Sequence, residues 1–299
     1  ELYESTGGEY SGIGAVMSQN TETGVITLVQ IYKDSPAEKA GLKANDILYK
    51  VEGKEVTGKD LSKVVSKVKG EKGTTVELTV LRGEDAKEVT VTATRDTVQA
   101  QTIEYKMMDD KIGYIRVSEF DTVTYDQYKE ALDDLEKQGM TGLVVDLRNN
   151  PGGSLSTVCD MLDLMLPKGL IVYTEDKNGK KTEMKSDEEH QFTKPLAVLV
   201  NGNSASASEI YSGAIQDYGI GKIVGTQTYG KGVVQQIFDL DDGTAVKLTI
   251  AEYFTAKGRS INGKGITPDV KVEYENNEEN PDADNQLDKA VEEVKAQMK

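Results

Sequence analysis

The sequence predicts an α/β domain preceded by a smaller β-rich module, and three observations support this division. The chain has 299 residues, enough for two domains of roughly 100 to 200 residues each. Residues 8–96 contain short β-branched runs that end at glycines or charged turns. From Lys111 onward, strand patterns alternate with helical patterns, which is typical of a parallel sheet with right-handed crossovers.

The β-rich module is predicted to hold strands and two short helices. A capping Ser35, Pro36 at the first helical position and Gly41 just past the end predict a short helix. Apolar residues on one face of 61–68 predict a second helix. The predicted strands are 26–31, 47–51, 76–81 and 89–93.

The α/β domain is predicted from alternating segments. The run 142–147 is almost wholly apolar, which is typical of a strand buried on both faces. An acidic stretch at 273–284 precedes apolar residues at helical spacing, which predict a final helix. The other predicted strands are 112–117, 196–200 and 222–224, and the other predicted helices are 125–138, 156–166 and 206–218.

Composition excludes several function classes. Lys plus Arg is 35 and Asp plus Glu is 51, so the net charge of −16 repels nucleic acid. The longest aliphatic run, 196–200, is far shorter than the roughly 20 residues of a membrane-spanning helix. The single cysteine, Cys159, forbids an intrachain disulfide and a thiolate metal cluster. We therefore expect no metal, no nucleic acid and no membrane span.

Histidine usage is the most informative part of the composition. His190 is the only histidine, and it lies in a polar stretch ending at Pro195 that reads as a solvated loop. A Ser-His-Asp enzyme would depend on this residue, and a zinc enzyme needs more histidine ligands. Acid–base chemistry is therefore expected from Lys, Asp, Glu or Tyr. The chain starts at Glu1 without a recognisable targeting signal.

Residues 201–210 form the first candidate site segment. They follow a predicted buried strand and open a helix, where small residues expose unpaired amides and the positive end of the helix dipole. Ser206 and Glu209 also have the spacing of a capping box, which would give Ser206 a purely structural role. Spacing alone favours the cap over a nucleophile.

Two further segments favour a nucleophile over a helix cap at Ser206. Lys231 lies between glycines after an apolar strand, and a desolvated lysine loses affinity for its proton and can act as a general base. A solvated turn lysine is the alternative. The segment 146–153 ends a buried strand in a Gly-Gly pair, whose amides can face an oxyanion. An ordinary turn, with Asp146 and Arg148 bracing it, is the alternative there.

Together these segments resemble the C-terminal processing peptidases, also called tail-specific proteases. The resemblance runs from about residue 10 to 272 and rests on four motifs in family order: DLRNNPGG, SASASEI, TYGKGVVQ and GKGITPD. It implies a serine endopeptidase that needs no cofactor and has a crotonase/ClpP-like β-α core. Members of this family act outside the cytoplasm, in the periplasm or cell envelope, and some are homo-oligomers.

The resemblance also implies the roles of individual residues. Ser206 would be the nucleophile, Lys231 the base, and Gln235 the residue that holds the lysine amine. Because Gln235 follows Lys231 in a strand-like run, a bend at Gly232 must bring their side chains together. The oxyanion hole would use the amides of Ala207 and Gly152.

The β-rich module resembles the PDZ domain that these peptidases carry. Gly12, Ile13 and Gly14 match the loop whose amides capture a terminal carboxylate, and the strand 15–18 would accept a peptide as an added strand. The expected partners are proteins or peptides with free, apolar C-termini. Lys69 stands where some relatives have a basic residue tied to substrate sensing, although arginine is expected there.

The predicted division of the chain is an upstream remnant at 1–9, the PDZ domain at 10–96, the peptidase core at 97–274, and a linker with a final helix at 275–299. Two alternatives remain open. One is a PDZ-containing binding or scaffold protein whose α/β domain is catalytically silent. The other is an acyl-thioester enzyme with an oxyanion hole for an enolate, which the PDZ-like module and the paired Ser and Lys segments disfavour.

Overall fold

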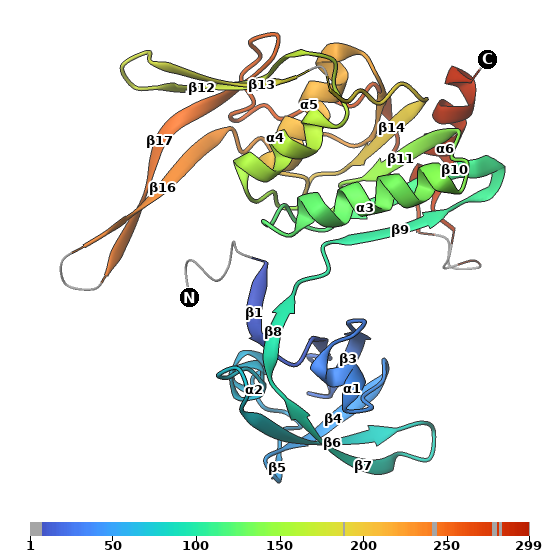
Figure 1. Cartoon of the computed structure of the whole chain (residues 1–299), viewed down its shortest axis with the longest axis vertical. Helices are drawn as coiled ribbons and strands as arrows, with labels where there is room; N and C mark the ends of the chain where they lie inside the picture. The colour runs from blue at the N-terminus through green and yellow to red at the C-terminus, as the bar shows by residue number, and fades with distance from the viewer. Residues whose placement is uncertain (1–7, 188, 241–243, 277–279, 281–282, 299) are drawn as a thin grey trace. The chain divides into compact units, whose positions relative to one another are not determined.

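A computed structural model of the chain describes residues 8–187, 189–240, 244–276, 280 and 283–298. The chain forms two compact units, Glu1–Gln101 and Thr102–Lys299 (Figure 1). The sequence placed the boundary after residue 96, but β8 (Asp96–Gln99) pairs with β1 (Glu9–Gly12) inside the first unit. Most of the predicted remnant at 1–9, and parts of the acidic linker, lie outside the described residues.

The first unit contains a sheet with the strand order β2-β3-β4-β6-β7, and β5 pairs with β4. Its helices pack on the sheet through Ala37 in α1 and through Val64 and Val68 in α2. Ser35 caps α1 through its hydroxyl, as predicted. The bounds are β2 (Ala15–Gln19), β3 (Ile26–Ile31), α1 (Pro36–Lys39), β4 (Asp46–Val51), β5 (Lys54–Glu55), α2 (Leu61–Val68), β6 (Thr75–Arg82) and β7 (Lys87–Thr94).

The buried ion pair of this unit predicts acid sensitivity. Asp46, with a side chain only 1% exposed, accepts two 2.7 Å hydrogen bonds from Arg82. Burial opposes the charge of Asp46, but the hydrogen bonds from Arg82 and from the Lys43 N–H, together with the positive charges of both residues, outweigh it and hold the carboxyl pKa below its ordinary value. Because the folded pKa is the lower one, this stabilisation is present at neutral pH and is lost as the pH falls below the ordinary carboxyl pKa. Acid unfolding of Asp46→Asn, followed by circular dichroism, should show a weaker pH dependence than the wild type; an unchanged profile would contradict this.

The second unit is built on a six-stranded sheet with the order β18-β15-β14-β11-β10-β9. All neighbouring strands are parallel except β9, which is antiparallel to β10. The parallel strands therefore end at one edge, where α/β proteins commonly place their sites. The strand bounds are β9 (Ile103–Met107), β10 (Ile112–Val117), β11 (Gly142–Asp146), β14 (Leu196–Val200), β15 (Lys222–Gly225) and β18 (Val270–Lys271).

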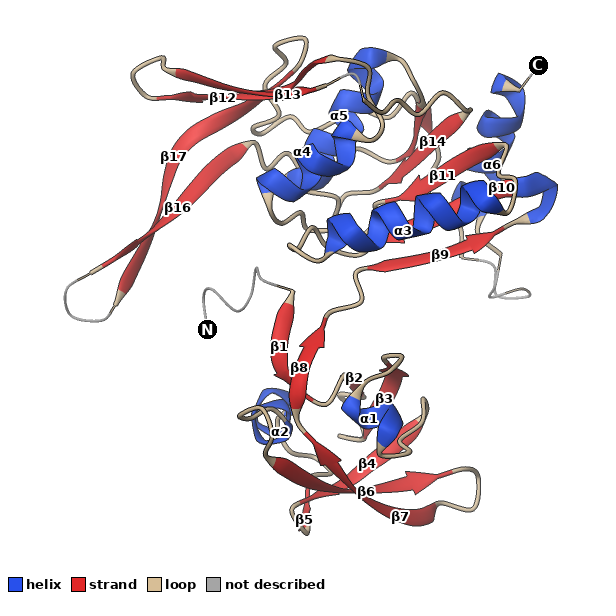
Figure 2. Ribbon diagram, viewed as in Figure 1, coloured by secondary structure: helices blue, strands red, loops and turns tan. Residues whose placement is uncertain are grey.

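Helices cover both faces of this sheet (Figure 2). Alternate residues of β11 show the division: Leu143 and Val145 pack into the core formed with α3, α4 and α5, whereas Val144 packs with Ala290 and Val294 of α6. Burial on both faces explains the continuous apolar runs in the sequence. The helix bounds are α3 (Thr124–Lys137), α4 (Leu155–Asp163), α5 (Ala207–Tyr218) and α6 (Asn285–Gln297), and a 3-10 turn spans Asp109–Lys111.

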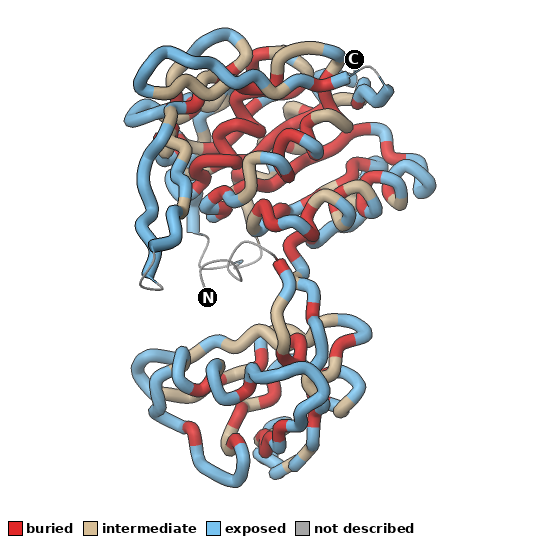
Figure 3. Tube along the Cα trace, turned by 60° about the vertical axis from the view of Figure 1, so that its left-hand side comes forward, coloured by how far each residue is buried: buried red, intermediate tan, exposed pale blue. Residues whose placement is uncertain are grey.

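A second sheet in this unit, with the order β13-β12-β17-β16, has a projecting part. Its strands are β12 (Gly169–Asp176), β13 (Lys181–Ser186), β16 (Val233–Asp239) and β17 (Ala245–Thr255). Strand β12 pairs with β17 only from Ala251 to Thr255, so the distal part of the β16–β17 hairpin is a two-stranded ribbon. Figure 3 shows this ribbon as largely exposed.

The predicted elements are largely confirmed. Strands β3, β10 and β14 and helix α2 have the predicted bounds, and α3, α4, α5 and α6 lie within a few residues of prediction. Strands β12, β13 and β17 were not predicted, although β12 begins with the apolar run 170–173 and β17 alternates apolar and polar residues from Val246 to Ile250. No helix in the described part of the chain is long and apolar enough to cross a membrane.

Candidate active site

Ser206 lies at the turn from β14 into α5, in a strained conformation. Its φ of 56° and ψ of −114° fall in a region that residues other than glycine rarely adopt, and its side chain is buried. A strained strand-to-helix turn places the hydroxyl of its residue at the carboxyl end of the sheet, as nucleophile turns do. The start of α5 adds the positive end of the helix dipole.

The Glu209 carboxylate stabilises this turn and also a second loop. The carboxylate is fully buried in the first turn of α5 and accepts four hydrogen bonds. Oxygen Oε2 accepts from the backbone N–H groups of Ser206 and Lys231, each at 2.8 Å. Oxygen Oε1 accepts at 2.6 Å from the Thr228 hydroxyl and from the Gly230 N–H. One side chain therefore joins the serine turn to the lysine loop.

The geometry at Glu209 bounds the distance between the two predicted reacting residues. The backbone nitrogens of Ser206 and Lys231 both lie 2.8 Å from one oxygen, so their separation cannot exceed the sum of those distances. The Tyr229 N–H also donates to the Ser204 carbonyl at 3.0 Å. The sequence predicted only a capping role for Glu209. The capping bond is present, but the sequence did not indicate the bonds from the lysine loop.

Lys231 and Gln235 lie at the start of the ribbon. The Lys231 side chain is half-buried, and its amine makes no hydrogen bond or ion pair with another described residue. Gln235 is exposed and lies in β16 just after a bulge at Val234. Gly232 lies close to a neighbouring loop, since a Cβ there would lie 2.1 Å from the Asn262 nitrogen. The bend expected at Gly232 to bring Lys231 and Gln235 together stays a prediction. The role of Gln235 stays a prediction.

The Gly-Gly turn lies against the serine. A Cβ on Gly152 would lie 2.8 Å from the Cβ of Ser206 and 3.0 Å from the Ala207 nitrogen. The Gly152 N–H donates to Asn150 Oδ1 at 2.8 Å, so it is occupied here. The Gly153 and Ala207 amides donate to none of the residues that the structure describes. The predicted oxyanion residues therefore surround Ser206, although Gly152 would have to release Asn150 to act as a donor.

Tyr253 of β17 is a neighbour of Ser206 that the sequence did not indicate. Its N–H donates to the Gly232 carbonyl at 2.8 Å, and its ring is buried in the core. Burial raises the pKa of the Tyr253 hydroxyl, and a hydrogen bond with the Ser206 side chain partly offsets this. The position of Tyr253 beside Ser206 was not predicted, because strand β17 was not predicted.

The site matches a known family. Residues 111–272 match the model of peptidase family S41, and residues 27–82 match a PDZ-domain model. The chain belongs to peptidase family S41. The resemblance to C-terminal processing peptidases is thereby confirmed, as is a mixed α/β peptidase fold with a PDZ domain.

Relatives of this S41 chain carry names consistent with the resemblance. It is 40% identical over 271 residues to the carboxy-terminal processing protease CtpA of Bacillus subtilis, covering 90% of this chain and 58% of that protein. It is 38% identical over 275 residues to a probable CtpA-like serine protease of Staphylococcus epidermidis, covering 91% of this chain and 55% of the relative. The chain thus spans less than two thirds of these relatives.

A solved structure supports the same fold. The photosystem II D1 C-terminal processing protease matches the S41 chain with a TM-score of 0.56 and 31% sequence identity. The match covers 91% of this chain and 75% of that protein. The similarity therefore extends over both the PDZ and the peptidase parts.

The PDZ domain contains an apolar groove of about 190 Å³ between β2 and α2. Gly12 ends β1, and Ile13 and Gly14 connect it to β2. The amides of Ile13 and Gly14 have no acceptor within the described ranges, so both are available to a ligand. Lys69 caps the end of α2 and lines the groove, with its amine 4.7 Å from the ring centre of Tyr10.

Three further residues have no role in the proposed reaction. His190 is an exposed loop residue, as predicted. Cys159 is buried, and burial raises the pKa of its thiol to about 12. Tyr229 is 70% exposed and so gives Lys231 little shelter from water. Within the described residues, no cluster of three or more His, Cys, Asp or Glu side chains could hold a metal.

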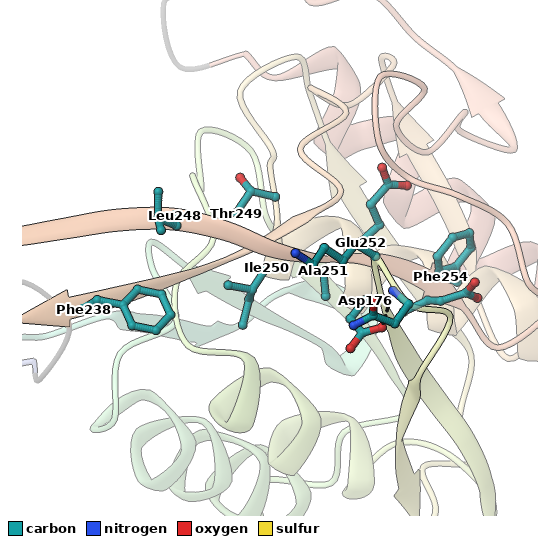
Figure 4. A pocket seen from close by; sticks show the side chains of 11 residues that line it. Asp176, Phe238, Leu248, Thr249, Ile250, Ala251, Glu252 and Phe254 are labelled. Carbon is teal, nitrogen blue, oxygen red and sulfur yellow. Dashed lines mark hydrogen bonds between the residues drawn. The ribbon is translucent and has the colours of Figure 1, made fainter.

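A larger cavity lies on the ribbon, away from Ser206. It measures about 630 Å³ and is formed between the β12–β13 turn and the exposed face of the ribbon (Figure 4). Phe238, Leu248 and Ile250 supply an apolar wall, and Asp176 and Glu252 supply carboxylates. None of the predicted catalytic residues lines it.

Proposed function

We propose that this chain is a serine endopeptidase that binds the free C-terminal tail of a protein in its PDZ domain and cleaves the polypeptide at Ser206 with Lys231 as base. The observation that carries this proposal is the Glu209 carboxylate. Its Oε2 atom accepts hydrogen bonds from the backbone N–H groups of both Ser206 and Lys231. The family and the names of the relatives support the same reaction class.

The proposed reaction is acyl transfer. Lys231, in its neutral form, takes the proton of the Ser206 hydroxyl while Oγ attacks the carbonyl carbon of the scissile peptide. The oxyanion that forms is stabilised by the Ala207 amide and by a donor from the turn at Gly152. The lysine ammonium returns its proton to the leaving amine, and water then attacks the acyl-enzyme to release the second product.

Two features favour tight positioning of these groups. The strained φ of Ser206 fixes the hydroxyl at the start of α5, where the dipole favours developing negative charge. A hydrogen bond between the Tyr253 hydroxyl and the Ser206 side chain would further restrict the orientation of the serine. Gln235 would hold the Lys231 amine only after its side chain turns inward, because it is exposed in the free chain.

Tail recognition is proposed to use the PDZ groove. The free amides of Ile13 and Gly14, with Gly12 beside them, would bind the terminal carboxylate, and the tail would add as a strand to β2. Apolar side chains of the tail would enter the groove against Val65 and Val68. Lys69, at the same end of the groove, would sense the bound carboxylate.

A glycine variant tests tail recognition. Gly14 has a φ of +77°, and a Cβ there would lie 2.5 Å from the Ser35 Cβ, so Gly14→Ala must displace the loop. We expect kcat/KM for a protein with an apolar tail to fall by about 10-fold or more, since strain of ~1–3 kcal/mol opposes the binding conformation. Hydrolysis of a short peptide without such a tail should change little.

The matched control is Gly53→Ala, because Gly53 has a φ of +67° but no heavy atom within 4 Å of the added Cβ. Tail binding measured by calorimetry should survive this change. Equal losses on both substrates with Gly14→Ala, at an unchanged melting temperature, would argue against tail recognition by the PDZ domain.

Further proposals concern the setting of the reaction. The core is proposed to be of the crotonase/ClpP type, which the strand and helix alternation around the parallel sheet supports. The chain is proposed to act outside the cytoplasm and to use no cofactor, as the family resemblance implies. Assembly into a homo-oligomer is compatible with the same resemblance.

A further inference from the structure

Arg148 joins the oxyanion turn to the C-terminal helix. Its side chain is only 13% exposed, and all three guanidinium nitrogens donate hydrogen bonds. Nε and one terminal nitrogen bind Asp146, the latter at 2.6 Å. The terminal nitrogens also bind the two oxygens of Asp284 at 2.7 and 2.9 Å, and one of them binds Gln286 at 3.1 Å. Such a two-point Arg–carboxylate pair fixes orientation as well as distance.

The partners of Arg148 are themselves fixed at the start of α6. Asp284 is the N-cap of this helix and accepts from the Leu287 N–H at 3.0 Å. Burial opposes the charge of Asp284, but the hydrogen bonds and charge of Arg148, together with bonds from the Leu287 and Gln286 N–H groups, outweigh it and hold the pKa of this carboxyl below its ordinary value. The Gln286 amide donates to the Val272 carbonyl at 2.7 Å. Helix α6 in turn is anchored in the core by Ala290 and Val294.

The other side of the same turn contacts the serine segment. The Asn150 carbonyl accepts from the Ala205 N–H at 3.1 Å and from the Ser208 hydroxyl at 2.9 Å. Gly152 lies against Ser206, as described above. The turn 146–153 is therefore held between the start of α6 and the start of α5.

We propose that Asp284 and Gln286 are positioning residues for catalysis, which act through Arg148 to hold the oxyanion turn against Ser206. This inference rests on the proposed peptidase function of the same site. Neither residue touches the reacting atoms, and both lie more than 75 positions beyond the serine in the chain. They become part of the active site only through the docking of α6.

Loss of the Asp284 charge should lower kcat and leave KM nearly unchanged. Asp284→Asn replaces one accepting oxygen by an NH₂ group, so Arg148 loses a partner and half of its compensating charge while it remains buried. A turn displaced by about 1 Å reduces the rate by up to ~100-fold, because the oxyanion forms only in the transition state. Binding of the substrate in its ground state should change little.

The experiment measures kcat and KM of the full chain on a short peptide for the wild type, Asp284→Asn and Gln286→Ala. We expect kcat to fall by ~10–100-fold in Asp284→Asn, by a smaller factor in Gln286→Ala, and KM to stay within about twofold. The matched control is Asp288→Asn, an exposed residue one turn further along α6, which should leave both constants unchanged.

A double-mutant cycle with Arg148→Lys tests the route of the effect. If Asp284 acts through Arg148, the double variant should lose no more activity than Arg148→Lys alone. Melting temperatures of all variants identify any loss that comes only from unfolding. A wild-type kcat in folded Asp284→Asn, or additive losses in the cycle, would overturn the inference. Cleavage that persists in Ser206→Ala would instead overturn the proposed function, so the two failures are distinguishable.

Discussion

Replacement of Ser206 by alanine should abolish peptide cleavage while the chain remains folded. The hydroxyl is the only proposed nucleophile, and removal of the nucleophile in dissected serine peptidases lowers kcat by about 10⁶-fold. We expect a loss of at least ~10⁴-fold here, measured by release of a fluorogenic peptide product. The melting temperature should stay near that of the wild type, because the hydrogen bond from the residue 206 backbone N–H to Glu209 remains and only the side-chain bond with Tyr253 is lost.

Lys231→Ala is the companion variant and should give a loss of similar size. The two losses should not add in the double variant, because a nucleophile and its base act as one unit. Ser212→Ala is a suitable control, since Ser212 lies in the same helix and its hydroxyl bonds only backbone carbonyls. Ordinary cleavage by folded Ser206→Ala would exclude acyl transfer at this residue. An inactive wild type, equal to both variants, would favour the silent scaffold instead.

Glu209→Gln should lower both stability and activity. The carboxylate accepts four hydrogen bonds, and the amide of glutamine turns one of its two oxygens into a donor. At least one buried backbone N–H then lacks an acceptor, which costs about 1–3 kcal/mol of unfolding free energy. Because the same oxygens align the serine turn with the lysine loop, kcat should also fall by ~10²-fold.

Denaturant unfolding and peptide kinetics on the same samples check this expectation. Glu130→Gln is a matched control, since Glu130 is exposed on α3 and the charge change is identical. Wild-type kcat in Glu209→Gln would show that the shared carboxylate is not needed to align the site. A loss of stability without a loss of kcat would assign Glu209 to the helix cap alone.

Much of the site could be predicted from the sequence because its parts are local. Residues 201–210 and 225–235 each follow an apolar strand. Their small residues predict a turn at the carboxyl edge of a sheet. Family motifs then supplied the roles of Ser206 and Lys231. The fold was predicted for the same reason: helix α2 and strands β3 and β14 carry complete local patterns.

The remaining features depend on contacts between distant segments. Glu209 has an evident local role as a cap, so nothing in its neighbourhood indicates that it also binds Gly230 and Lys231. Tyr253 and Asp284 reach the site from strands and turns far along the chain, and their positions follow from tertiary packing alone. Strand β17 was not predicted although Val246, Leu248 and Ile250 alternate with polar residues, and the exposure of the distal ribbon follows from tertiary structure alone.

The most direct test of the Ser206–Lys231 proposal is to trap the covalent intermediate. The full chain is mixed with a slowly turned-over peptide ester, quenched in acid, and analysed by peptide mass spectrometry. The proposal predicts an acyl group on the peptide that contains Ser206, greatly reduced in Lys231→Ala and absent in Ser206→Ala. An acyl group on another residue, or rapid cleavage in which no adduct forms on Ser206 even under single-turnover conditions, would contradict it.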